Sequence, residues 1–215
     1  MNRDLKELVD VCKDPNTTYL NGSACKLENL PILFFRQFCE NIEKSTSIAT
    51  LDLSFNDIGG MEEVKLNALF NAIRKNKSIQ TLKLISTKLN TLSKTNFAKL
   101  VKMFEENQSI NEVRLDYNEL DEHSTEFYKI NLYVRRNEIQ SELDTLEPVF
   151  KKNKTSPGFF AQKASSNGHL TNGNGHVAEE TDYSAKIAEL KLNLQTVRGK
   201  LFHLSYTIGP TFQAK

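Results

Sequence analysis

The sequence predicts an α/β solenoid built from about four strand–helix units of 31 residues each. The first observation is an apolar frame over Ile48–Ile58, Ile-x-x-Leu-x-Leu-x-x-Asn-x-Ile, that returns at steps of 31 residues. The second is a helical apolar face that returns at the same step, in register with the first. The four frames are Thr17, Leu20, Gly22, Cys25, Leu27; Ile48, Leu51, Leu53, Asn56, Ile58; Ile79, Leu82, Leu84, Thr87, Leu89; and Ile110, Val113, Leu115, Asn118, Leu120.

Each unit is expected to begin with a short strand and to continue into a helix. In the strand, Leu51 and Leu53 alternate with polar residues, which is the period of two that an extended chain shows. In the helix, apolar residues stand at i, i+3, i+4 and i+7, so one face is buried. The helical positions are Phe35, Phe38, Cys39, Ile42; Leu66, Leu69, Phe70, Ile73; and Phe97, Leu100, Val101, Phe104. Such units bury their faces only against neighbours and therefore stack.

The Asn-type position of the frame has a physical reason. Where the chain leaves the strand it turns inward, and backbone groups carried into the interior need hydrogen-bond partners. A carboxamide, with two donors and an acceptor, can supply them. Asn56 and Asn118 suit this role, while Cys25 and Thr87 are weaker substitutes.

This pattern resembles the leucine-rich repeat, and the long helical units are similar to those of the ribonuclease-inhibitor-like subfamily. Tropomodulin, NOD-like receptors and the Ran GTPase-activating protein share that type of unit. The resemblance covers roughly residues 15–137, although the period is slightly longer than the ~20–29 residues usual for these repeats. It implies a short right-handed solenoid and does not specify a ligand.

The domain organisation follows from where the frame stops. Residues 1–150 are predicted to form the repeat domain, with a helix over residues 4–14 as the N-terminal cap and two helical pieces over residues 123–150 as the C-terminal cap. Residues 151–182, rich in Gly, Asn, Ser and Lys, are predicted to be a flexible linker. An amphipathic helix is expected over residues 183–208, followed by a tail over residues 209–215.

The terminal helix carries a heptad seam typical of a coiled coil. Its six docking positions are Ile187, Leu190, Leu194, Val197, Leu201 and Leu204. The flanking positions include Lys186, Lys191, Arg198 and Lys200 and no acidic residue, so a parallel homodimer would juxtapose like charges. The seam therefore favours a protein partner with a helical segment that has acidic flanks. A helix folded back onto its own solenoid is the alternative, of equal weight.

The strand residues that do not enter the core are the candidate partner-binding residues. By register these are Asp52, Phe55, Lys83, Ile85, Arg114, Asp116 and Tyr117. Apolar and aromatic groups that the core does not need, next to arginine, are the composition of protein-binding hot spots. The alternative is a solvated face whose charges pair with one another.

The composition and the cysteine pattern indicate which partners, location and thiol chemistry to expect. A formal net charge of +1 gives no reason to expect a nucleic acid or an anionic membrane as partner. The N-terminus has no apolar signal core and no run of about 18 apolar residues occurs, so a cytoplasmic location is expected. The three cysteines, an odd number without ligand spacing, are predicted to be structural thiols.

No catalytic, metal or cofactor constellation is visible in the residues. We therefore predict a non-enzymatic protein-interaction module, or adaptor, that binds through the strand face and the terminal helix. The resemblance leaves open two alternatives, a GTPase-activating or other enzyme-regulatory protein and an actin-filament cap.

Overall fold

The computed structural model describes residues 9–155 and 176–207 and divides the chain into two compact units, Met1–Glu138 and Ile139–Lys215. The boundary falls inside helix α5 (Thr125–Thr155), earlier than the boundary after residue 150 that the sequence predicts. No helix within the described residues is long and apolar enough to traverse a bilayer.

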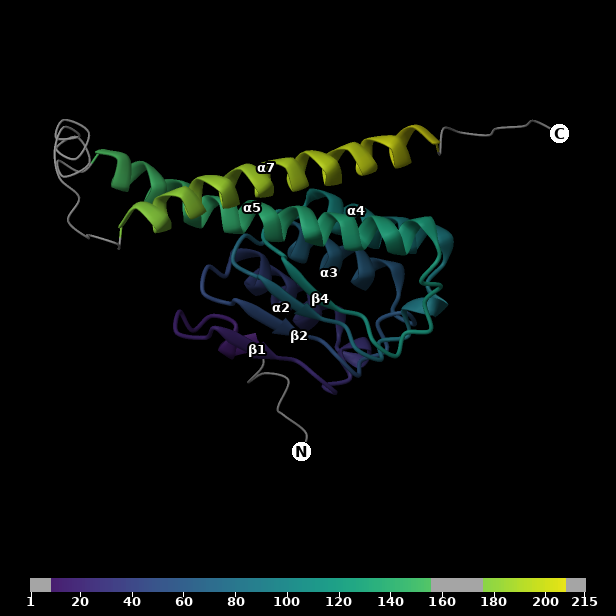
Figure 1. Ribbon diagram of the computed structural model, residues 1–215. Helices are drawn as coiled ribbons and strands as arrows, with labels where there is room; N and C mark the ends of the chain where they lie inside the picture. Colours follow the sequence, from purple (N-terminus) through teal and green to yellow (C-terminus); the bar gives the residue numbers. More distant parts are fainter. Residues whose placement is uncertain (1–8, 156–175, 208–215) are drawn as a thin grey trace, which may run out of the picture. The chain divides into compact units, whose positions relative to one another are not determined.

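The first unit is a single parallel sheet with the strand order β1-β2-β3-β4. Its strands are β1 (Tyr19–Asn21), β2 (Thr50–Asp52), β3 (Thr81–Lys83) and β4 (Glu112–Arg114). Between them run α2 (Ile32–Lys44), α3 (Glu63–Lys75) and α4 (Lys94–Glu106), with short 3-10 helices η1 (Leu27–Asn29) and η2 (Leu89–Thr91). Figure 1 shows the three helices side by side behind the sheet. The predicted α/β solenoid of four strand–helix units is confirmed.

The register of the sheet is the register of the sequence repeat. Leu20 pairs with Leu51, Leu51 with Leu82, and Leu82 with Val113, each step being 31 residues. The three leucines are fully buried, as are Phe35, Phe38 and Ile42 of α2. Every predicted position of the helical face is buried except Phe97, which is half-buried. The core is therefore a stack of equivalent side chains between the sheet and the helices.

Asparagine side chains hold the turns that follow β2 and β4, as predicted. Asn56 Nδ2 donates to the carbonyl oxygens of Gly22, at 2.9 Å, and Leu53, at 2.8 Å, while its Oδ1 accepts from the Leu27 N–H at 3.1 Å. Asn118 has the same role two repeats later, where its Nδ2 donates to Leu84 O at 2.6 Å. Each amide thus joins two consecutive repeats at groups that water cannot reach.

A second set of buried asparagines holds the turns that follow α3 and α4. Asn107 Nδ2 donates to Ile73 O at 2.9 Å and Asn76 O at 3.1 Å, and its Oδ1 accepts from the N–H groups of Ser109 and Ile110. Asn76 repeats this pattern 31 residues earlier, and Asn137 donates to Asn107 O and Ile110 O. Sequence reasoning missed this set. The signal was present as Asn-x-Ser-Ile, at Asn76–Ile79 and Asn107–Ile110.

Helix α5 is one continuous helix rather than the two pieces predicted for residues 123–150. Near its middle lies Asn137. The side chain of Asn137 donates to carbonyl oxygens of the preceding repeat and does not take the place of helical hydrogen bonds of α5. Pro148 lies inside this helix and has no N–H to donate to the carbonyl oxygen of Asp144, four residues earlier. Residues 151–155, predicted to be linker, belong to this helix.

The N-terminal cap and the tail are described in part. Residues 9–11 are helical, within the cap predicted for residues 4–14, and Val9 O accepts a hydrogen bond from Asn41 Nδ2 at 3.0 Å. Residues 4–8 of that cap, residues 156–175 of the predicted linker and the tail at residues 209–215 lie outside the described residues.

In the second unit, helix α7 (His176–Thr207) begins seven residues before the predicted start at residue 183. Ile187, Leu190, Leu194 and Val197 of its seam are buried, whereas Leu201 and Leu204 are half-buried. Ion pairs join it to α5, from Lys191 to Glu147 at 2.7 Å and from Lys186 to Glu142 at 3.7 Å. Lys191 lowers the pKa of Glu147 by its hydrogen bond and its charge. The acidic flanks that the seam favours are thus supplied by this chain's own α5.

Cys12, Cys25 and Cys39 form no disulfide. Cys12 and Cys39 are buried, and loss of solvent raises the pKa of each thiol to about 12. Cys25 is half-buried, with its Sγ 3.4 Å from Ser23 O. Thiols with pKa values this high are protonated at neutral pH and are poor nucleophiles.

The buried asparagines lead to a stability prediction. Asn107→Ala removes four hydrogen bonds, those to Ile73 O and Asn76 O and those from the N–H groups of Ser109 and Ile110. The free energy of unfolding should therefore fall by about 3 kcal/mol in urea titration, since each buried group left unsatisfied costs roughly 1–3 kcal/mol. Asn71→Ala, at an exposed position of α3, is the matched control and should change it by less than about 0.5 kcal/mol. Equal effects of the two substitutions would contradict the structural role of Asn107.

Candidate functional site

The outer face of the sheet, opposite to α2, α3 and α4, carries the predicted binding residues. Strand alternation sends Leu20, Leu51 and Leu82 inward, so the residues on either side of them point outward. The outer face has one column before the leucines (Tyr19, Thr50, Thr81, Glu112) and one after them (Asn21, Asp52, Lys83, Arg114). Sequence reasoning considered the second column and omitted the first.

The N-terminal half of this face is a closed cluster around Asp52. The hydroxyl of Tyr19 donates to Asp52 Oδ2 at 3.0 Å, and Lys83 Nζ lies 3.9 Å from the same oxygen. Lys83 Nζ also sits 5.4 Å from the centre of the Tyr19 ring, within cation–π range. Asp52 and Lys83 are thus brought together, and Tyr19 is the partner that sequence reasoning missed.

The C-terminal half of the face is more open. Arg114 Nε donates to Asp116 Oδ2 at 3.0 Å, and both side chains are about half exposed. Ile85, in the middle of the face, is half-buried, and its N–H donates to Ser54 Oγ at 3.2 Å. The predicted charged residues thus pair with each other within each half of the face. The predicted aromatic residues, Phe55 and Tyr117, are not part of these ion pairs.

Phe55 and Tyr117 project from the turns that follow β2 and β4. Both have a left-handed backbone, with φ values of 59° and 57°, and both are largely exposed, at 59% and 83%. Ala24 and Ser86 hold the equivalent positions with φ values of 54° and 53°. The repeat therefore requires the left-handed turn in every unit but requires no particular side chain there.

A bulky residue in the left-handed region stores strain. The Cβ atom approaches neighbouring backbone groups there, which costs roughly 1–3 kcal/mol for a residue other than glycine. Asn-type residues and glycine tolerate the region better than aromatic residues do. The strain from Cβ is common to Ala24, Phe55, Ser86 and Tyr117, so what distinguishes the two aromatic residues is the ring that each exposes to water.

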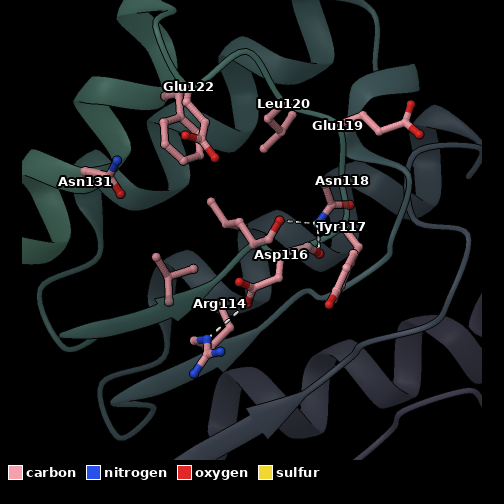
Figure 2. Close-up of a pocket in the computed structure, with 11 residues that line it drawn as sticks. Arg114, Asp116, Tyr117, Asn118, Glu119, Leu120, Glu122 and Asn131 are labelled. Atoms are coloured by element: carbon pink, nitrogen blue, oxygen red, sulfur yellow. Dashed lines mark hydrogen bonds and ion pairs between the residues drawn. The ribbon is translucent and has the colours of Figure 1, made fainter.

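A hollow of about 300 Å³ lies beside Tyr117, at the end of the sheet. It is lined by β4 and the loop that follows it, with Glu122 and with Phe127 and Asn131 of α5. Figure 2 shows Arg114, Asp116 and Glu122 around it, with Asn131 on the helix across from the strand. The polar lining and the open rim suit a peptide or loop better than an apolar small molecule.

Charged side chains of the described residues form ion pairs between neighbouring repeats. No group of three or more metal-ligating side chains occurs within the described residues. Several shifted pKa values belong to ion pairs between neighbouring repeats, such as Asp57, whose pKa Lys88 lowers through a 2.7 Å contact, and Glu106, whose pKa Arg74 lowers. These pairs join repeat to repeat at the loops and helices and have a structural role.

Comparison with known proteins gives the following findings. No protein-family model matches the chain, and no curated protein matches its sequence. Among solved structures, actin-binding site 2 of leiomodin-1 is similar, with 15% identity and a TM-score of 0.47 over 71% of this chain and 99% of that chain. The tropomodulin C-terminal domain from Caenorhabditis elegans is also similar, with 15% identity and a TM-score of 0.42 over 67% and 99%.

The strained turn leads to a prediction at a single site. Tyr117→Gly should raise the free energy of unfolding relative to Tyr117→Ala by about 1 kcal/mol, because glycine adopts the left-handed region without a Cβ contact. Both variants remove the same ring, so the comparison isolates the backbone contribution. Urea titration of the two variants measures it, and a glycine variant less stable than the alanine variant would contradict the strain.

Proposed function

We propose that the chain is a non-enzymatic protein-interaction module whose outer sheet face binds a protein partner. The observation that carries the proposal is the pair of exposed aromatic side chains, Phe55 and Tyr117, on left-handed turns of two repeats. Folding does not require either ring, since alanine and serine serve at the equivalent positions. Exposed aromatic side chains that the fold does not require are typical of protein-binding hot spots.

The geometry of the two rings suits a protein ligand. The turns belong to the second and fourth strands, and adjacent strands lie about 4.8 Å apart, so the rings are presented about 10 Å from each other along the sheet. Aromatic anchors at such a distance, rimmed by the Asp52–Lys83 and Arg114–Asp116 pairs, match the core and rim of a binding hot spot.

The small size of the face bounds the partner. Four strands span about 15 Å, which fits a peptide, a loop or the edge of a domain rather than an obligate interface of ~2,000 Å² or more. Interfaces of this size are transient unless a second contact contributes.

The helix seam is left out of the proposed site. Its first four side chains are already buried, and α5 supplies its acidic counter-charges. A partner helix at this seam would first have to displace contacts within the second unit. The sequence left a foreign helix and the chain itself open as docking partners, and these contacts favour the chain itself.

Affinity capture with a matched control tests the outer face. Phe55→Ala/Tyr117→Ala should reduce the amount of bound partner at least tenfold, because hot-spot aromatics each contribute roughly 1–3 kcal/mol. Leu33→Ala/Phe34→Ala removes two exposed apolar side chains of α2, at 76% and 50% exposure, and should leave capture unchanged. If every captured protein survives the Phe55/Tyr117 substitution, the outer face is not the binding site.

The regulatory and filament-cap alternatives are separated by two additions to that experiment. If the chain stimulates GTP hydrolysis by any of a panel of small GTPases, it is a GTPase-activating protein and the proposed function as an interaction module is wrong. Cosedimentation with actin-filament ends that Phe55→Ala/Tyr117→Ala abolishes would specify the partner as actin and keep the proposed face.

A further inference from the structure

The last strand of the sheet exposes hydrogen-bond donors that every earlier repeat uses. Two N–H groups of each unit donate to carbonyl oxygens of the next unit at 2.8–2.9 Å. The pairs are Gly22 to Asp52, Ala24 to Ser54, Leu53 to Lys83, Phe55 to Ile85, Leu84 to Arg114 and Ser86 to Asp116. The next members of the series are the N–H groups of Leu115 and Tyr117, and no group among the described residues accepts from them.

One carbonyl oxygen on the same edge also lacks the backbone donors that its equivalents in the earlier repeats have. The carbonyl oxygens of Thr18, Ala49 and Gln80 each accept two N–H groups from the following unit. Asn111 is the next in that series, and no backbone N–H of the described residues donates to its carbonyl oxygen. The β4 edge thus offers donors and an acceptor in the spacing of a parallel ladder, which is the template for adding a strand.

The apolar positions of the fourth repeat are also incompletely covered. Val113, Leu115 and Leu120 are half-buried. Their counterparts in the earlier repeats are at most 2% exposed, as for Leu20, Leu51 and Leu82; Leu53 and Leu84; and Leu27, Ile58 and Leu89. The same edge therefore lacks both a hydrogen-bond partner and an apolar cover, and the hollow lined by Phe127 and Asn131 lies beside it.

The charge around this edge is acidic. Glu112, Asp116, Glu119, Asp121 and Glu122 are all exposed there. Arg114, on the same strand, is already paired with Asp116 at 3.0 Å. A ligand with basic side chains would therefore be favoured over an acidic one, and the exposed Tyr117 ring offers a surface for cation–π contact.

We propose that the β4 edge binds an extended basic segment of a protein partner as a fifth strand of the sheet. Carbonyl oxygens of the segment accept from the N–H groups of Leu115 and Tyr117, and one of its N–H groups donates to Asn111 O. Alternate side chains point into the hollow toward Phe127, as in other complexes formed by strand addition. The inference deepens the proposed interaction function; it shares Tyr117 with the outer face and is independent of Phe55.

Amide hydrogen exchange on the full-length chain, read by NMR, tests the proposal with two synthetic hexapeptides, alternating Lys-Val and alternating Glu-Val. In the free protein, the Leu115 and Tyr117 amides should exchange faster than their equivalents Leu84 and Ser86. The Lys-Val peptide at millimolar concentration should slow both at least tenfold, and the Glu-Val peptide should not. No slowing, or equal slowing by both peptides, would overturn the proposal.

Charge-neutral variants give the matched control. Glu119→Gln/Glu122→Gln should weaken the binding of the Lys-Val peptide at least threefold, whereas Glu40→Gln/Glu62→Gln, on exposed parts of other repeats, should leave it unchanged. Phe55→Ala should also leave it unchanged, which separates a failure at this edge from a failure of the outer face.

Two other occupants give distinct results. If the Leu115 and Tyr117 amides are protected in the free protein at every concentration, another segment of this chain covers the edge. If protection appears only as concentration rises, together with a dimer in light scattering, a second copy covers it. Either result would overturn a basic partner segment as the occupant.

Discussion

The structure depends on satisfying backbone groups where the chain turns, and buried carboxamides do this at both turns of the repeat. Asn56 and Asn118 serve the turn after the strand, while Asn76 and Asn107 serve the turn after the helix. Each side chain bonds to groups of two consecutive repeats, so it fixes the step between them as well as the turn. Leucine and phenylalanine side chains stack at the same step because the turns are held there, which couples hydrogen bonding to the packing of the core.

This constraint also determines which side chains the fold leaves free to vary. Inward side chains and turn amides are specified by the repeat, but the outer face of the sheet is not. There the earlier repeats pair Asp52 with Lys83 and Tyr19, while the later ones present Tyr117 beside a hollow and an open strand edge. The strand-addition site that we propose therefore lies at the C-terminal end of the array, where no further repeat among the described residues uses the donors of the fourth one or covers its leucines.

The sequence alone predicts the features that recur in every repeat, but it does not predict those that depend on a contact between repeats. The 31-residue step predicts the strand pairing, the buried helix face and the role of Asn56, because each leaves a residue type at a fixed spacing. The left-handed turns were not predictable, since Ala24, Phe55, Ser86 and Tyr117 share a φ value and no chemistry. Asn76 and Asn107 were missed because Asn-x-Ser also occurs by chance, and only the structure shows their partners. The charges beside the α7 seam indicated acidic flanks but could not show that α5 supplies them.

Native-state hydrogen exchange tests most directly whether the buried carboxamides hold the array together. The amides that bond to asparagine side chains, at Leu27, Ile79, Leu89 and Ile110, should open with the same free energy as the buried strand amides of Leu51 and Leu82, because breaking a turn separates two repeats. If those four amides exchange through local openings of much lower free energy while the strands stay protected, the turns are peripheral and the account is contradicted.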